Sequence, residues 1–232
     1  IIETTIPFLV REAMTQRGEV RVRKLEFHQT AQDFREGNWV IDQVTRLCDF
    51  QQQESLVLQV DLLGGAGSLV KQLETESNPL KELAFSTCGM QAYHHSRHTQ
   101  EQIEQQVFHA HKPKGPEYMR QLLGRDIGRY RLGWNGDVWI KYGPWLYAPM
   151  KPEYFSGPRL LTQQITKGMD SRVNSTYTDE EFVFNASISV TIMDRDSKYS
   201  CFFILAILNS SVTSWYYPIR LSPKHVKPSA LD

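Results

Sequence analysis

Cysteine is scarce in this sequence of 232 residues, and long apolar runs are absent from it. Cys48, Cys88 and Cys201 form no CxxC pair and leave one cysteine unmatched, which predicts neither a zinc ribbon nor a disulfide framework. The longest apolar run, residues 201–208, is far shorter than the roughly 18 residues that span a bilayer, and the first residues lack the basic stretch of a signal peptide. We therefore expect a cytoplasmic protein with no membrane partner and with small, reduced core cysteines.

Common catalytic signatures are also missing. The stretch 64–67 (GGAG) has neither the lysine of a Walker motif nor the spacing of GxGxxG, and no GxSxG elbow occurs. The three histidines of HHSRH, at His94, His95 and His98, lack the acidic residue of HExxH. Arg97 among them would repel a cation. The sequence therefore predicts no metal site, no catalytic residue and no cofactor bound by this chain itself.

Charge is segregated along the chain, although 26 Lys/Arg balance 26 Asp/Glu. Residues 1–78 contain eight Lys/Arg and twelve Asp/Glu, whereas residues 79–232 contain eighteen and fourteen. The excess is concentrated at residues 112–167, which hold ten Lys/Arg and four Asp/Glu together with many aromatic residues. Such a segment can neutralise phosphates and present planar side chains to bases, so it indicates nucleic-acid binding.

Hydrophobic periodicity predicts an α+β (mixed α/β) fold with β-rich and helical segments. In the acidic part, strands are expected at 4–13, 18–27 and 56–61, and helices at 33–44 and from Ser68 onward. In the basic part, Thr99 and Gln102 have the spacing of a capping box and predict a helix over 99–108. Further strands are expected at 159–165, 181–185 and 187–193, and a C-terminal helix, buried in its first half, at 198–216.

A hairpin is predicted around Asn135-Gly136, because this dipeptide favours a type I′ turn between 129–134 and 137–142. Alternation would then place Arg129 and Arg131 on one face and the aromatics on the other. Clustered arginines on one face repel each other unless a polyanion or carboxylates answer them. An ordinary solvated face and a core role stay open as alternatives, the latter for Trp134, Trp139, Trp145, Tyr147 and Phe155.

Four segments appear in an order that resembles the TaqI-like C-terminal specificity domain of adenine-N6 DNA methyltransferases and type IIG restriction-modification enzymes. They are GRDIGRY at 124–130, WIKYG at 139–143, YFSGPRLLTQQI at 154–165 and FFILAILNSSVTSWYY at 202–217, the last with the family's LNS helix at 206–210. The resemblance covers residues 79–232. It implies a target recognition domain whose partner is double-stranded DNA.

The sequence departs from an intact enzyme of that class, because it has neither an NPPY-type motif nor a glycine-rich S-adenosylmethionine loop. We expect residues 1–78 to be the end of a methyltransferase region with a connecting segment. The catalytic half would lie upstream in the same polypeptide and use S-adenosylmethionine to methylate a flipped adenine. This fragment itself would recognise DNA without catalysis.

The candidate contact residues follow from side-chain chemistry and from their expected exposure, since arginine pairs with guanine and glutamine with adenine in the major groove, and lysine contacts phosphate. An ion pair of Arg125 with Asp126 or another nearby carboxylate, in place of a base contact, is an open alternative. A basic protein-interaction module or an RNA-binding module is an open alternative for the whole region. A truncated enzyme is the least favoured interpretation. The base candidates are Arg125, Arg129, Arg131, Gln163 and Gln164, and the phosphate candidates are Lys112, Lys114, Lys141 and Lys167.

Overall fold

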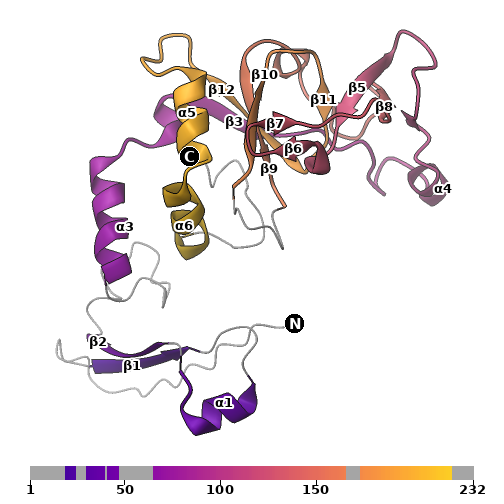
Figure 1. Ribbon diagram of the computed structural model, residues 1–232. Coiled ribbons are helices and arrows are strands. Elements are labelled where there is room, and N and C mark those ends of the chain that lie inside the picture. Colours follow the sequence, from indigo (N-terminus) through magenta and orange to yellow (C-terminus); the bar gives the residue numbers. More distant parts are fainter. Residues whose placement is uncertain (1–18, 25–29, 40, 47–64, 166–172, 221–232) are drawn as a thin grey trace. The chain divides into compact units, whose positions relative to one another are not determined.

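The computed structural model describes residues 19–24, 30–39, 41–46, 65–165 and 173–220 (Figure 1). The chain forms two compact units, Ile1–Leu73 and Glu74–Asp232. Helices and several sheets are present, which confirms the expected α+β class. Within the described ranges, no helix is long and apolar enough to cross a membrane. The predicted domain boundary after residue 78 stays a prediction.

In the first unit, β1 (Glu19–Lys24) pairs antiparallel with β2 (Ile41–Arg46), and α1 (Ala31–Glu36) lies between them in the sequence. β1 confirms the strand expected within 18–27. The strands expected at 4–13 and 56–61 lie outside the described residues. α3 (Gly65–Glu76), which begins in the first unit and ends in the second, confirms the helix expected from Ser68 and begins slightly earlier.

The helix predicted at 33–44 is wrong in its position. Thr30 caps α1 with a capping box to Asp33, so the helix starts earlier than expected. Gly37, with φ 78°, then ends it in the left-handed conformation that glycine adopts readily. The residues that follow are therefore free to form β2.

The second unit contains a four-stranded antiparallel sheet in the order β10-β9-β12-β3. Its strands are β10 (Ser175–Thr178), β9 (Arg159–Gln163), β12 (Ile188–Met193) and β3 (Ala84–Cys88). β9 and β12 confirm the strands expected at those places. All residues of β9 are buried, because this strand has a neighbour on each side and packed side chains on both faces.

The two faces of β9 belong to different clusters of the core. Leu161 packs in the larger cluster with side chains such as Phe155 and Ile140. Leu160 points to the other face and packs in the smaller cluster, which includes Leu205 of α5 and Tyr217 of α6. Alternation along one strand thus joins the sheet to both layers.

A second four-stranded sheet has the order β11-β5-β8-β4, with β11 parallel to β5 and the other pairs antiparallel. Its strands are β11 (Val183–Phe184), β5 (Tyr118–Leu122), β8 (Trp139–Lys141) and β4 (His109–Ala110). α4 (Gln100–Glu104) precedes β4. The predicted capping box between Thr99 and Gln102 is confirmed, although the helix is shorter than expected.

The hairpin predicted around Asn135-Gly136 is wrong. Gly136 does adopt a positive φ of 81°, but the flanking segments do not pair with each other. Instead, β8 pairs with β4 and β5, and β7 (Arg131–Leu132) pairs with β6 (Ile127–Gly128). β6 and β7 are therefore joined by a turn at Arg129-Tyr130.

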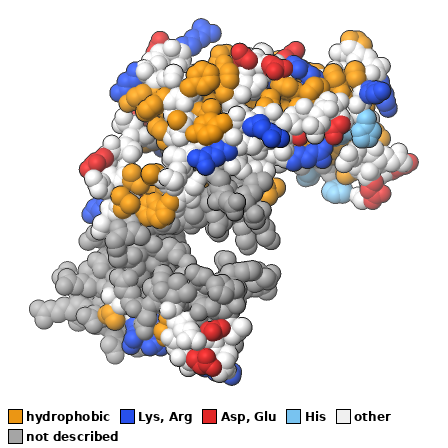
Figure 2. Space-filling model, in the orientation of Figure 1, with side chains coloured by type: hydrophobic (Ala, Val, Ile, Leu, Met, Phe, Trp, Pro, Cys, Tyr) orange, Lys and Arg blue, Asp and Glu red, His pale blue; other side chains and the backbone are white. Residues whose placement is uncertain are grey.

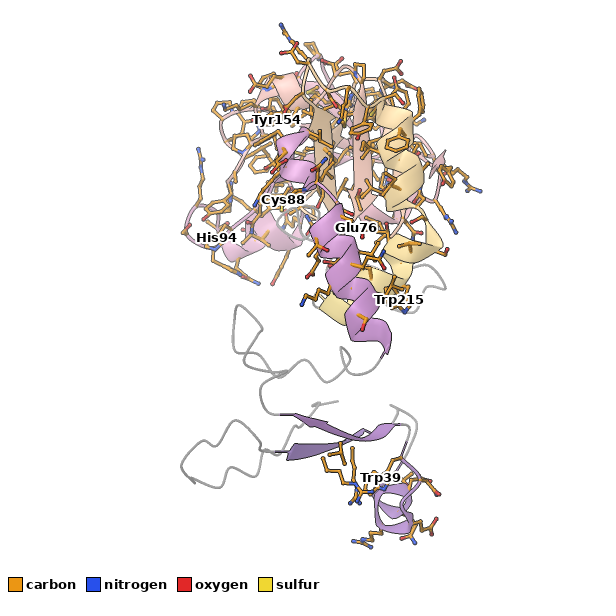
Figure 3. The ribbon with its side chains drawn as sticks, turned by 90° about the vertical axis from the view of Figure 1, so that its left-hand side faces the viewer. Trp39, Glu76, Cys88, His94, Tyr154 and Trp215 are labelled. Carbon is orange, nitrogen blue, oxygen red and sulfur yellow. The ribbon has the colours of Figure 1, made fainter. Side chains whose placement is uncertain are left out.

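The predicted C-terminal helix is two helices, α5 (Cys201–Leu208) and α6 (Ser211–Arg220), which follow one another in Figure 1. The expectation that the first half is buried is right for Ile204, Leu205 and Leu208 and wrong for Phe202 and Phe203, which are 62% and 48% exposed. Cys88, at the end of β3 and labelled in Figure 3, is also exposed, so it is no core cysteine. Short 3-10 helices complete the unit at Leu80–Glu82, Gly124–Asp126 and Pro152–Tyr154.

Candidate nucleic-acid interface

The β6–β7 hairpin presents the basic side chains of the GRDIGRY segment. Gly128 pairs with Arg131, so Arg129 and Tyr130 form a two-residue turn between the strands. Tyr130 has a φ of 60°, and its backbone N–H donates to the carbonyl oxygen of Ser175 in β10 at 2.9 Å. The turn is thereby attached to the edge of the main sheet.

A pocket of about 450 Å³ lies beside this turn. The arginines proposed as base-contacting residues, Arg125, Arg129 and Arg131, all line it. Lys and Arg side chains are visible in Figure 2 across the face where Figure 1 draws β6 and β7. The remaining lining residues are Asp126, Gly128, Gly133 and Asn135.

Arg125 is exposed and forms ion pairs with two carboxylates. Its Nη2 lies 3.3 Å from Asp137 Oδ2, and its Nε lies 3.8 Å from Asp126 Oδ1. The ion pair with Asp126, which was the alternative to a base contact for Arg125, is therefore present in the structure. Because its side chain is 62% exposed, these ion pairs are weak and leave the guanidinium accessible to another anion.

Asp126 contributes a buried carboxylate to the pocket. Its Oδ2 accepts a hydrogen bond from the Leu123 backbone N–H at 2.8 Å, and its carbonyl oxygen accepts one from Gly133 N at 2.8 Å. Burial raises the pKa of this carboxyl group, while the Leu123 N–H and the Arg125 charge oppose the rise. Asp126 thus fixes the backbone around the pocket as well as adding a negative charge.

The other two arginines differ in what they contact. Arg129 is exposed overall, but its Nη2 donates to the carbonyl oxygen of Asn209, and its guanidinium lies 5.8 Å from the centre of the Tyr130 ring. Arg131 is also exposed, and no hydrogen bond or ion pair holds its guanidinium within the described part of the chain. Arg131 is therefore the arginine of the pocket whose donors are most available.

The glutamines expected at base edges are not exposed, so the expectation of exposure is wrong for both. Gln163 is 6% exposed, and its Oε1 accepts from Asn174 Nδ2 at 3.1 Å. Gln164 is 7% exposed, and its Nε2 donates to Cys88 Sγ at 3.2 Å. They lie in and directly after the central strand β9, which buries them.

Of the lysines expected at phosphates, Lys112, Lys114 and Lys141 are described, and none of the three lines the pocket. Lys112 and Lys114 are exposed in the loop between β4 and β5. Lys141 is 39% exposed, with its Nζ 3.7 Å from Glu117 Oε1 and 4.9 Å from the centre of the Trp145 ring. Lys167 lies outside the described residues.

One arginine of the basic segment is part of the core. Arg159 is fully buried, and its guanidinium donates to the carbonyl oxygens of Gly157, Phe155 and Glu180 at 2.7, 2.5 and 2.5 Å. Burial lowers its pKa to about 10. Counting charges in the sequence could not separate this structural arginine from the exposed ones, although its place inside the apolar segment RLL was a signal.

The histidines of HHSRH do not form one solvated group. His98 is buried and its Nε2 pairs with the Trp145 carbonyl oxygen at 2.9 Å. His94, labelled in Figure 3, is exposed and stacks on Tyr147 with 4.4 Å between ring centres. Among the described residues, no group of three or more His, Cys, Asp or Glu is arranged to hold a metal ion.

The arginine pocket does not fit S-adenosylmethionine. Guanidinium groups of Arg125, Arg129 and Arg131 line it, and the sulfonium of that cofactor is itself a cation. An anionic ligand is the chemical class that this lining favours.

Comparison with known protein families gives a match that includes the region of the arginine pocket. Residues 119–228 match the family model described as the TaqI-like C-terminal specificity domain, which confirms the resemblance over that range. The match includes the arginine pocket and the strands and helices from β5 to α6. Domains of this family are associated with DNA sequence recognition in methyltransferases. No curated protein matches the chain.

Proposed function

We propose that the part of the chain matching the TaqI-like C-terminal specificity domain recognises duplex DNA through the arginine pocket beside the β6–β7 turn. The observation that carries the proposal is the convergence of Arg125, Arg129 and Arg131 on one exposed pocket. Arginine is suited to this task, because its planar guanidinium can donate two hydrogen bonds to guanine or to a phosphate.

The three arginines would divide the work according to their present contacts. Arg131, which has no partner in the described part of the chain, would contact DNA first. Arg125 would exchange its exposed ion pair with Asp137 for a phosphate or a base edge. Arg129 would contribute while it keeps the turn attached to Asn209. Lys112 and Lys114 would add phosphate contacts that set orientation without reading sequence.

The wider assignment follows the family resemblance. The chain would serve a bacterial, cytoplasmic restriction-modification enzyme in which a methyltransferase domain of the same polypeptide binds S-adenosylmethionine and methylates adenine at N6. The present chain would supply the choice of site and no catalysis. Residues 1–78 would be the end of the methyltransferase region and the segment that connects it to the recognition domain.

Fluorescence anisotropy with a fluorescein-labelled 30-base-pair duplex pool of random sequence tests the proposal. We expect the association constant of the 232-residue chain to fall between 50 and 200 mM salt, by a slope of about −0.9 in log K against log salt for each phosphate contact. Arg131→Ala should weaken binding at least about fivefold, because it removes a guanidinium that makes no hydrogen bond or ion pair to the described residues. Arg195→Ala is the matched control, since Arg195 is exposed but does not line the pocket.

Three results would contradict the proposal. One is duplex binding that is absent or unaffected by salt, and another is an equal loss in Arg131→Ala and Arg195→Ala. The third is a preference for single-stranded RNA over the duplex, which would favour the RNA-binding alternative.

A further inference from the structure

Tyr130 occupies an unusual position for an aromatic residue. Its side chain is 55% exposed, and it belongs to neither cluster of the hydrophobic core. It stands at the tip of the β6–β7 turn between Arg129 and Arg131, both of which line the pocket. An exposed aromatic residue flanked in the sequence by two exposed arginines has the combination of groups that binds a nucleobase and its phosphates.

Tyr130 also has a backbone conformation that is unusual for a tyrosine. Its φ of 60° lies in the left-handed region, where glycine or asparagine is favoured over an aromatic residue. The conformation is maintained by the hydrogen bond from Tyr130 N to the Ser175 carbonyl oxygen. A residue that holds an unfavourable conformation while its ring is exposed contributes little to folding, which directs attention to a function.

Other exposed aromatic side chains already have ring partners. Phe202 lies 4.7 Å from Tyr177, and Phe203 stacks on Tyr199 at 5.1 Å, measured between ring centres. Within the described ranges Tyr130 has no aromatic partner, and the Arg129 guanidinium lies 5.8 Å from the centre of its ring. A nucleobase could therefore reach the exposed part of this ring without displacing another aromatic group.

We propose that Tyr130 is a base-stacking residue, which places its ring against a nucleobase at an opened or unstacked step of the bound duplex. This inference rests on the proposed function, because the arginines of the pocket would bring the duplex to the turn. Aromatic stacking is tolerant of base identity. Tyr130 would therefore increase affinity for distorted DNA, while the arginines contribute the hydrogen bonds to phosphates and base edges.

The test compares two labelled 30-base-pair duplexes that are identical except for one abasic site, which leaves room for a ring inside the stack. The 232-residue chain should bind the abasic duplex about tenfold more tightly than the intact one. Tyr130→Asn should bind both duplexes equally, whereas Tyr130→Phe should keep the preference. Tyr147→Asn, at an exposed tyrosine that stacks on His94 and lies outside the β6–β7 hairpin, is the control and should keep it too.

Melting temperature separates a binding role from a structural one. Asparagine tolerates a positive φ, so Tyr130→Asn should melt within about 3 °C of the wild type. A large loss of stability in Tyr130→Asn would make Tyr130 a structural residue and overturn the inference. The inference would also be overturned if the wild type bound both duplexes equally, or if Tyr130→Asn still preferred the abasic duplex. Salt-dependent binding in either case would leave the proposed function intact. If the wild type binds neither duplex at 50 mM salt, both proposals fail.

Discussion

The Arg129 guanidinium donates a hydrogen bond to the backbone carbonyl oxygen of Asn209, which lies 80 residues later in the chain. The Asn209 side chain is fully buried, and it bonds both backbone groups of Ser175, accepting from N and donating to O at 2.9 Å each. Tyr130 N donates to the same Ser175 oxygen. Asn209 therefore links the break between α5 and α6 to β10 and to the turn that carries the candidate site.

Replacement of Asn209 should destabilise the fold. Asn209→Ala removes two buried hydrogen bonds and leaves the backbone groups of Ser175 without that partner. We expect the free energy of unfolding, measured by urea denaturation, to fall by about 2–4 kcal/mol. Asn135→Ala, at an exposed asparagine, should change it by less than about 0.5 kcal/mol. A loss as small for Asn209 as for Asn135 would show that the Ser175 contacts contribute little.

Features that depend on neighbours in the sequence could be predicted. Thr99 and Gln102 are three residues apart, and their reciprocal capping is local chemistry, so the start of α4 was recognised. The arginine-rich segment was also recognised from composition alone. Its arrangement as a pocket could not be predicted, because that depends on the pairing of β6 with β7 and on the position of Asp126.

Features that depend on distant partners were missed. Asn135-Gly136 has the composition of a tight turn, yet the actual hairpin turns at Tyr130, a residue that turn preferences would not select. Gln163 and Gln164 are polar, and only the central place of β9 in its sheet shows that they are buried. The break after α5 likewise depends on the bonds between Asn209 and a strand 34 residues earlier.

Arg159 should be essential for stability and independent of DNA binding. Arg159→Met keeps most of the volume of the side chain but removes the guanidinium donors to the carbonyl oxygens of Gly157, Phe155 and Glu180. Among the described residues, the Phe155 oxygen keeps only the hydrogen bond from the Phe182 backbone N–H. We expect the free energy of unfolding to fall by about 3–5 kcal/mol in urea denaturation. Arg159→Lys should recover only part of the loss, since one ammonium cannot reproduce the planar fork.

The control for this prediction is Lys151→Met, because Lys151 is an exposed cation whose Nζ lies 3.6 Å from Glu153 Oε1. Its replacement should change the free energy of unfolding by less than about 0.5 kcal/mol. If Arg159→Met were as stable as Lys151→Met, the buried guanidinium would not be needed to satisfy those carbonyl groups.

His109 should make stability depend on pH. Burial lowers the pKa of its imidazole below the ordinary value of 6.5, and the neighbouring Gln121 side chain acts in the opposite direction. Its Nδ1 lies 2.9 Å from the Tyr93 hydroxyl, which accepts from the Phe108 backbone N–H. The neutral imidazole is therefore the form that the fold favours.

The sign of the effect follows from the lowered pKa. Well above pH 6.5 both the folded and the unfolded chain hold neutral His109, and its contribution to stability is complete. As the pH falls through 6.5, the unfolded chain gains a proton that the folded chain resists, so stability is lost with a slope of at most about 1.4 kcal/mol per pH unit. Urea denaturation at pH 7.5 and 5.5 should show this loss in the wild type and in His95→Gln. The loss should be smaller in His109→Gln, and an undiminished loss there would assign it to other groups.

Asp137 should restrain DNA binding by Arg125. Its Oδ2 lies 3.3 Å from Arg125 Nη2, and both side chains are substantially exposed. Asp137→Asn would remove one negative charge beside the pocket and release the guanidinium, so we expect about two- to fivefold tighter binding of a random-sequence duplex at 50 mM salt. The salt slope should become steeper, by up to about one contact, if Arg125 then reaches a phosphate.

Glu153→Gln is the matched control, because it removes an exposed carboxylate from the ion pair with Lys151, outside the pocket lining. Equal gains in the two variants would reflect net charge alone, whereas a gain confined to Asp137→Asn would locate bound DNA beside Arg125.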